Sequence, residues 1–318
     1  MAEIFPELQT AIASSATPQF ASITLKQLLS HSSGINDTDS DPRGIAMLTR
    51  SLSSGVFSPK NLRYWILTEW IKETDPPPMF TQQHKDFHYS DIGYMVAGAM
   101  IERAAGKPWE ELMVEKIFAP LGLHSAGFGP QSSVGKIDAP LSHMIIENKV
   151  TAVPAGYGVF DTFLAIGPAG TVHMSLQDMA KWIGWYAGKG ERGPHIISSA
   201  TFTKLMTPVV RDEGSSGPGR DVQYCLGWYE LNDHEQNSKI YMHECSDDMN
   251  KAIITLIPES DFGVVVVTNI AGSKATETLF ELTGALTQRY NRTPASSPVP
   301  SAAGFRPAHG GYPGVVKI

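Results

Sequence analysis

Cysteine, charged residues and long apolar runs are all scarce in this chain of 318 residues. Its two cysteines, Cys225 and Cys245, cannot form a disulfide framework, which favours a reducing compartment and a cytoplasmic location. No run approaches the roughly 18 apolar residues of a membrane span, and the segment MAEIFPELQT lacks the basic and apolar parts of a secretory signal. The net charge of −7 and the pI near 5.8 argue against the basic surface that is typical of nucleic-acid binders. We therefore expect neither a membrane nor a nucleic acid as partner.

Apolar residues, in contrast, are abundant enough to build a large core. They make up 42% of the chain against 18% charged residues, which excludes wholesale disorder and implies a surface rich in neutral polar groups. His84 and His88 stand four residues apart, as metal ligands on one helix face do, but no third ligand clusters with them. We expect no metal and no other cofactor.

Helical and strand patterns occupy different parts of the chain. Apolar periodicity predicts helices over residues 23–29, 62–72, 92–105, 109–118, 174–187 and 275–290. Three β-rich runs separated by turn residues predict an antiparallel meander over residues 239–243, 251–257 and 262–269. A helical block followed by strands and a final helix indicates the α+β class.

Composition divides the chain into three parts. Residues 1–22 form a lead segment rich in Ala and Ser, and residues 23–291 carry the periodic patterns of one domain. Residues 292–318 are rich in Pro, Ser and Gly, so we expect a disordered tail. The alternative is a docked extension in which Val315, Val316 and Ile318 complete a sheet edge.

Six segments carry recognisable patterns in a fixed order. They are TLKQLLSHSSG (24–34), FHYSDIGY (87–94), IFAPLGL (117–123), PAGTVHMSLQD (168–178), LGW (226–228) and GVVVVTN (263–269). Their order and spacing resemble those of the serine β-lactamase and penicillin-binding-protein-like family, including its class C, esterase and fungal transesterase branches. The resemblance implies a β-lactamase/transpeptidase-like α+β fold, in which helices flank an antiparallel sheet and a helical subdomain stands beside it.

The same resemblance assigns roles to three residues. The family uses a nucleophilic Ser-x-x-Lys helix turn, a Tyr-x-Asn loop whose tyrosine exchanges protons with the lysine, and a Lys/His-x-Gly strand that helps hold the oxyanion. The tyrosine corresponds to Tyr89, with Asp91 in place of the asparagine, and the strand corresponds to His243. We expect Tyr89 and His243 to face one cleft, with Tyr89 the more important. The alternatives are a tyrosine that only packs against a helix start and an exposed strand histidine.

The expected nucleophile is not in its usual place. The family's Ser-x-x-Lys lies well upstream of the TLKQLLSHSSG segment, whereas only 23 residues precede that segment here, so we expect the fold to lack its N-terminal strands. The one Ser-x-x-Lys in the chain, Ser133 to Lys136, lies in a predicted loop. Cys245 stands two residues from His243 on the predicted strand, either as an alternative nucleophile or as a small buried residue. Cys245 and the aspartates at 247 and 248 are also expected to crowd and charge the strand edge.

These observations leave three functional hypotheses. The first is a β-lactamase-like hydrolase or acyltransferase (transesterase) that acts on a small-molecule ester, thioester or amide in fungal-type secondary metabolism, with an atypical or degenerate active site. The second keeps the pocket but performs proton transfer without a nucleophile, through Tyr89, Asp91 and His243. The third is a non-catalytic relic. The sequence leaves the oligomeric state open.

Overall fold

Two structural units make up the chain, and each is described by itself. The computed structural model describes residues 1–15, 18–35, 46, 49–51, 53–56, 58–72, 86–156, 164–217, 220–233 and 238–290. The first unit comprises Met1–Met113 and Phe163–Ala169, and the second comprises Val114–Thr162 and Gly170–Ile318.

Helices build the first unit. Its described elements are short 3₁₀ turns at Pro6–Leu8, Pro18–Ser22 and Leu164–Ile166, and helices α1 (Gln9–Ser14), α2 (Leu25–Leu29), α4 (Pro59–Lys72), α5 (Asp91–Ala105) and α6 (Trp109–Met113). The helix α9 (Gly167–Gly170) begins in this unit. Apolar side chains of α4 and α5 form its core together with those of the N-terminal segment. The helices predicted over 23–29, 62–72 and 92–105 are confirmed with small shifts of their ends.

Local sequence signals set the ends of these helices. The Thr24 hydroxyl accepts the Gln27 N–H at 3.2 Å while the Gln27 side chain accepts the Thr24 N–H at 2.9 Å, a reciprocal cap that starts α2. Gly106 ends α5 in the left-handed region at φ 73°, and its N–H donates to the Glu102 carbonyl at 2.9 Å.

A buried arginine connects four segments of the first unit. The Arg63 side chain on α4 is 0% exposed, and its Nε and Nη2 donate to the Glu102 carboxylate on α5. Nη1 and Nη2 donate to Glu110 on α6 at 3.0 and 2.8 Å, and Nη1 also donates to the Leu164 carbonyl at 3.0 Å. Arg63 therefore holds α4, α5, α6 and the turn at Leu164–Ile166 together through hydrogen-bonded ion pairs.

The second unit contains the sheet. Its described helices are α7 (Ala119–Leu121), α10 (Leu176–Ala187), α11 (Ser199–Leu205) and α12 (Ser273–Tyr290). Its strands are β1 (Gly127–Phe128), β2 (Ser142–Ile146), β3 (Lys149–Val153), β4 (Val172–His173), β5 (Val210–Arg211), β6 (Arg220–Tyr224), β7 (Tyr229–Asp233), β8 (Ser238–Ser246), β9 (Lys251–Ile257) and β10 (Phe262–Thr268). Six of these form one antiparallel sheet in the order β10-β9-β8-β7-β6-β5. The predicted meander is confirmed as β8, β9 and β10.

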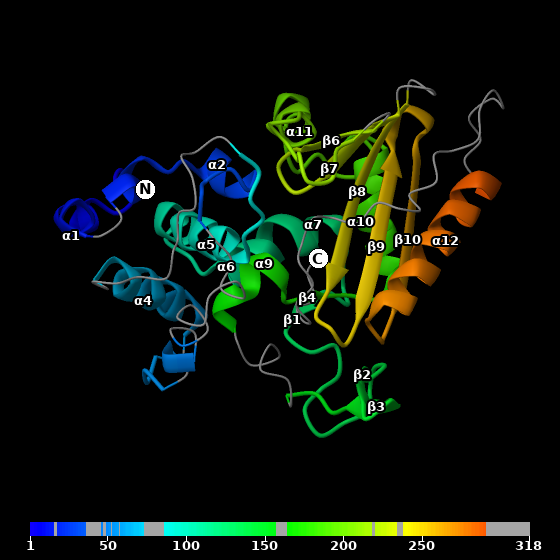
Figure 1. Ribbon diagram of the computed structural model, residues 1–318, viewed down its shortest axis with the longest axis horizontal. Helices are drawn as coiled ribbons and strands as arrows, with labels where there is room; N and C mark the ends of the chain where they lie inside the picture. Colours follow the sequence, from blue (N-terminus) through cyan, green and yellow to red (C-terminus); the bar gives the residue numbers. More distant parts are fainter. Residues whose placement is uncertain are drawn as a thin grey trace. The chain divides into compact units, whose positions relative to one another are not determined.

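Helices cover both faces of this sheet. β8, β9 and β10 stand side by side, with α10 against one face and α12 along β9 and β10 on the other (Figure 1). Ile183 of α10 packs with Ile254 and Leu256 of β9 in an apolar cluster. Because both faces are buried, all seven residues of β9 are buried, as is typical of a central strand.

The predicted helix over 109–118 is interrupted. α6 ends at Met113, and a wider π-type turn follows at Val114–Phe118. Pro120 has no N–H to donate to the carbonyl of Lys116 four residues earlier, so the regular helical ladder cannot continue through this point.

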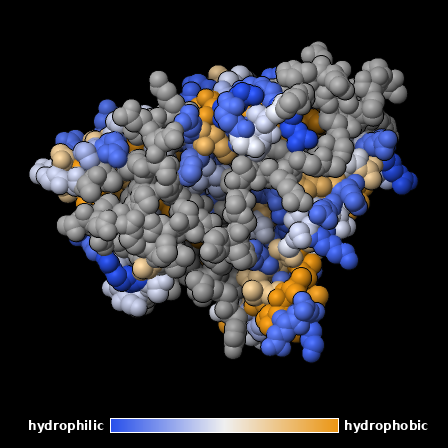
Figure 2. Space-filling view, viewed as in Figure 1, coloured by the Kyte–Doolittle hydropathy of each residue, from blue (hydrophilic) through white to orange (hydrophobic). Residues whose placement is uncertain are grey.

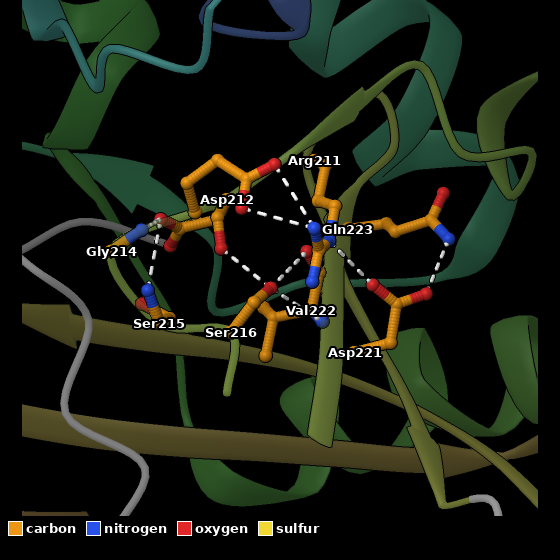
Figure 3. A network of polar contacts seen from close by, with 9 residues as sticks. Arg211, Asp212, Gly214, Ser215, Ser216, Asp221, Val222 and Gln223 are labelled. Atoms are coloured by element: carbon orange, nitrogen blue, oxygen red, sulfur yellow. Dashed lines mark hydrogen bonds and ion pairs between the residues drawn. The ribbon is translucent and has the colours of Figure 1, made fainter. Parts of the chain in front are cut away.

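Side chains hold the connection between β5 and β6 (Figure 3). Arg211 Nε donates to Asp221 Oδ1 at 2.8 Å, and Asp212 Oδ1 accepts the N–H groups of Gly214 and Ser215 at 3.0 and 3.2 Å. The Ser216 hydroxyl donates to the Asp212 carbonyl at 2.7 Å. These contacts fix the register of a short edge strand that pairs through only two residues, Val210 and Arg211.

A hairpin of β2 and β3 carries exposed apolar side chains. Glu147 and Asn148 form its two-residue turn with φ of 50° and 60°, the type I′ geometry that matches the twist of paired strands. Ile145 and Val150 are direct cross-strand partners, and they are 61% and 65% exposed. Figure 2 shows this hairpin as an orange patch at the lower right of the molecule.

Candidate functional site

Tyr89 stands directly before the N-cap of α5. Ser90 has an extended backbone, with φ −155° and ψ 115°, and its hydroxyl accepts the Gly93 N–H at 3.0 Å. A serine at this position satisfies one of the free amides of a helix start, which explains why α5 begins here. The half-buried Tyr89 is therefore held at a fixed distance from the helix N-terminus.

His31 fixes the same loop from the other side. Its Nδ1 lies 3.0 Å from the Ser90 nitrogen, and its carbonyl accepts the His88 N–H at 2.7 Å. The imidazole stacks on the Tyr89 ring with centroids 4.0 Å apart and planes 28° apart. Tyr94, one turn into α5, donates its hydroxyl to the Leu29 carbonyl at 2.8 Å. The segments that resemble LLSHxSG and YSxxGY thus form one connected structure.

Asp91 is the first residue of α5 and is 7% exposed. The positive end of the helix dipole favours the ionised carboxylate at this position. The carboxylate can only accept hydrogen bonds, whereas the amide that the resembled pattern has here can also donate. Asp91 therefore suits a substrate or neighbour that presents N–H or O–H groups.

His243 lies half-buried in the middle of β8, paired with Ile254 of β9. Its Nδ1 is 2.8 Å from the Gly227 carbonyl. Since a carbonyl can only accept, Nδ1 carries the proton, and Nε2 is the acceptor of the neutral ring. The ring centroids of Trp228, the last residue of LGW, and of Tyr229 lie 6.5 and 6.4 Å from that of the imidazole. The end of the LGW segment therefore packs beside His243.

Ser133 and Cys245, the two nucleophile candidates from the sequence, lie in surroundings that do not suit a nucleophile. Ser133 is exposed on a turn closed by the Lys136 N–H to the Ser133 carbonyl (2.9 Å), so the tetrapeptide has no helical geometry. The Ser133 N–H donates to Asp138 at 2.8 Å, which is the main reason that the pKa of Asp138 is lowered to about 2. Cys245 is 0% exposed, opposite Ala252 on β9. Thiols in such apolar surroundings are structural.

The expectation that aspartates charge the β8 edge needs refinement. Asp247 is buried, and its carboxylate accepts the N–H of Met249 at 2.8 Å and the side-chain amide of Asn250 at 2.8 Å. Its charge is thus used inside the turn between β8 and β9.

Two ion pairs of the sheet were not predicted from the sequence. The buried Glu230 of β7 accepts hydrogen bonds from the Tyr241 hydroxyl at 2.8 Å and from Lys239 Nζ at 3.2 Å. The pKa of Tyr241 is raised, mainly because the phenol is buried and also because it donates to the Glu230 carboxylate. Glu244 of β8 pairs with the buried Lys251 of β9. Glu230 of β7 lies directly opposite Tyr241 of β8. This pair could be predicted only after the alternation of side chains over residues 229–233 had been recognised as a strand.

The predicted site residues are distributed over both units. Tyr89 and Asp91 belong to the first, and Ser133, His243 and Cys245 to the second. The expectation that Tyr89 and His243 face one cleft stays a prediction. Within the described ranges no group of three or more His, Cys, Asp or Glu side chains is arranged to hold a metal, and His84 lies outside these ranges. No helix in the described part is long and apolar enough to cross a membrane.

Comparison with known proteins decides the family. The family model described as Beta-lactamase matches residues 6–286. The chain belongs to the beta-lactamase family. The resemblance that the sequence patterns predicted is confirmed. Tyr89, Asp91 and His243 are therefore interpreted as residues of a member of this family.

Individual relatives agree with this assignment. The PbpX protein of Bacillus subtilis (strain 168) is 29% identical over 212 residues, which cover 67% of this chain and 44% of that protein. The octameric penicillin-binding protein homologue from Pyrococcus abyssi has a TM-score of 0.62 at 21% identity, over 89% of this chain and 62% of that one. A D-stereospecific amidohydrolase from Streptomyces sp. has a TM-score of 0.59 at 16% identity, over 88% and 83%.

The TM-scores bear on the fold, and the covered shares show how much of each relative this chain spans. The β-lactamase/transpeptidase-like α+β fold predicted from the sequence is confirmed. The chain spans about half the length of the curated relatives it matches.

Proposed function

We propose that the chain catalyses acyl transfer on a small-molecule ester, thioester or amide, either as a hydrolase or as an acyltransferase. Membership of the beta-lactamase family supports this class of chemistry. The observation that carries the proposal is the position of Tyr89, which the Ser90 cap and the stacked His31 hold at the start of α5.

In this proposal the Tyr89 oxygen moves the proton. In its phenolate form it accepts the proton of the attacking water or acceptor alcohol as the tetrahedral intermediate forms, and the resulting phenol gives this proton to the leaving group as the bond to that group breaks. Asp91 accepts a hydrogen bond from the substrate or from a neighbouring donor. His243 orients the substrate, with its Nε2 as the acceptor of the neutral ring.

The decisive experiment is Tyr89→Phe, which removes the oxygen and keeps the ring. A panel of chromogenic esters, thioesters and amides first identifies a substrate that the wild-type protein turns over. On that substrate we expect kcat to fall by roughly 10²-fold or more, because general acid–base catalysis contributes about that much. His243→Ala is expected to lower kcat less than Tyr89→Phe does.

Folding and specificity are checked with a matched control. Tyr290→Phe alters an exposed tyrosine at the end of α12 and should leave both kcat and the melting temperature unchanged. Wild-type kcat in the Tyr89→Phe protein, with an unchanged melting curve, would sink the proposal.

A second candidate is proton transfer without a covalent acyl-enzyme, and the exposed turn around Ser133 favours it. Under this candidate neither a fluorophosphonate nor a chromogenic β-lactam adds mass to the protein, and β-lactam turnover stays at background. Loss of a nucleophile in a triad-like unit costs about 10⁶-fold in turnover, so the contrast is large. A covalent adduct that disappears in Ser133→Ala would instead identify a serine nucleophile.

A further inference from the structure

We infer that His31 is a positioning residue for Tyr89 and that it works only while its Nδ1 is unprotonated. His31 then gives the Tyr89 loop a built-in sensitivity to acid. The structural part of this inference is independent of the reaction, and only its effect on turnover rests on the proposed function.

The direction of one hydrogen bond carries the argument. Nδ1 of His31 lies 3.0 Å from the backbone nitrogen of Ser90. A backbone N–H can only donate, so Nδ1 has to be the acceptor, and the neutral ring carries its proton on Nε2. Protonation of Nδ1 would set two N–H groups against each other and leave the Ser90 amide without this acceptor.

The contact is not a surface contact that water can replace. His31 is 1% exposed, and the Ser90 backbone on the other side of the bond is buried with it. A buried donor that loses its acceptor cannot turn to water instead, so the folded loop is destabilised. We therefore expect the loop that carries Tyr89 to loosen when this bond is lost.

The same ring supports Tyr89 directly. The imidazole stacks on the Tyr89 ring at 4.0 Å, meets the Phe87 ring edge-on at 5.9 Å and lies 5.0 Å from the Tyr94 ring. Its backbone is in the left-handed region at φ 54°, so the residue sits at a sharp turn that fixes where the ring points. Loss of the Ser90 bond therefore acts on the residue that the reaction needs.

Among the described residues, the titratable groups nearest to His31 are the rings of Tyr89 and Tyr94 and, directly after Ser90, the carboxylate of Asp91. His88 gives only its N–H to the His31 carbonyl and exposes its side chain, and Lys26 on α2 is exposed. Acid protonates an imidazole, so the clamp is intact while the His31 ring is neutral and is lost once the pH falls far enough to protonate it.

The test reports on Tyr89 without requiring activity. The protein is labelled with 3-fluorotyrosine, and the Tyr89 signal is assigned among the ten tyrosines by its disappearance in Tyr89→Phe. Between pH 8 and pH 5 we expect the wild-type Tyr89 signal to shift in one transition. His31→Asn should keep the neutral-pH signal and lose the transition, because the amide oxygen can accept the Ser90 N–H and asparagine tolerates a positive φ.

The control and the overturning results are specific. His88→Asn changes the exposed neighbouring histidine and should keep the transition. A transition that persists in His31→Asn, or a wild-type signal that does not move over this range, overturns the inference. Because His31→Asn keeps the acceptor, the test stands even if a more severe variant such as His31→Leu fails to fold.

Turnover supplies the second arm. We expect His31→Leu, where it folds, to lower kcat about 10- to 100-fold with little change in KM, as small misplacements of a reacting group do. His31→Asn should restore kcat and remove the acid limb of the pH profile. If Tyr89→Phe leaves kcat unchanged while the fluorine transition behaves as expected, the proposed function fails and the positioning role survives. The reverse pattern would leave the function and remove His31 from it.

Discussion

At the scale of single residues, the buried Arg63 side chain carries ion pairs with two carboxylates of the first unit. Removing one partner of a buried ion pair leaves the other charge buried without compensation, at a cost of about 3–5 kcal/mol. We expect Arg63→Met to lower the free energy of unfolding by about that much, since Glu102 is almost fully buried and would face an apolar side chain. Urea denaturation measures the change.

A triple variant separates lost charge from lost packing. Arg63→Met combined with Glu102→Leu and Glu110→Gln removes the uncompensated carboxylates and should recover most of the loss. If the multiple variant is as unstable as Arg63→Met alone, the hydrogen bond to the Leu164 carbonyl or the shape of the side chain is what matters.

The two thiols give a second test at this scale. Burial raises the pKa of Cys225 to about 12, and Cys245 is fully buried on β8. Because the thiolate is the reactive form, we expect neither cysteine to react with a thiol reagent at pH 8 in the native protein, and both to react in guanidinium chloride. Counting reacted thiols by absorbance gives the result. Rapid native labelling that is lost in Cys245→Ala would restore Cys245 as a nucleophile.

The sequence identified Tyr89, Asp91 and His243 through residue patterns, but it did not identify what holds them. The acceptor for the Ser90 amide comes from His31, 59 positions away, and the hydrogen bond to His243 comes from Gly227, 16 positions away. Such partners are set by tertiary approach and leave no local periodic signal. His31 lies inside the LLSHSSG segment, so its place was visible and its role was not.

At the scale of elements, strands were predictable where burial leaves an apolar run. β9 (KAIITLI) and β10 (FGVVVVT) are covered by helices and read directly as strands. β6 (RDVQY) and β7 (YELND) carry polar residues at several positions and were missed, although they widen the sheet from three strands toward six. The β2–β3 hairpin was missed because its turn is Glu147-Asn148 and not the Asn-Gly or Asp-Gly that signals type I′.

That turn offers a test. A left-handed backbone costs a side chain such as Glu147 about 1–2 kcal/mol, whereas Asn and Gly adopt it readily. Replacing Glu147-Asn148 by Asn-Gly should therefore slow hydrogen exchange of the β2 and β3 amides several-fold. The matched control, Glu147→Gln, removes the charge and keeps the backbone cost, so it should leave the exchange unchanged. Equal slowing in both variants would point to charge and not to backbone conformation.

At the scale of the whole molecule, the sequence predicts that the C-terminal tail contributes little to the stability of the fold. Residues 293–318 lie outside the described ranges, and their few charged and few large apolar side chains predict that they bury too little surface to offset the entropy cost of ordering. We expect their deletion to change the melting temperature by less than about 2 °C, a shift that corresponds to about 1 kcal/mol for a chain of this size. Differential scanning calorimetry of both proteins measures it.

A larger drop has a specific meaning. β10 is the terminal strand of the described sheet and is apolar over most of its length. Strands of this kind at an edge are usually paired or covered. A loss of several degrees on deletion would therefore favour the alternative in which Val315, Val316 and Ile318 extend the sheet at β10.

The division of the first unit into Met1–Met113 and Phe163–Ala169 has a consequence for synthesis on the ribosome. Arg63 cannot complete its hydrogen bonds until Leu164, 101 residues later, has left the exit tunnel. During elongation at about 5–20 residues per second, the helices around Arg63 therefore exist for several seconds before the guanidinium can form its hydrogen bond to the Leu164 carbonyl. The early helices have to remain soluble in that interval, so we expect codon usage over the segment between residues 113 and 169 to affect the yield of folded protein in a heterologous host.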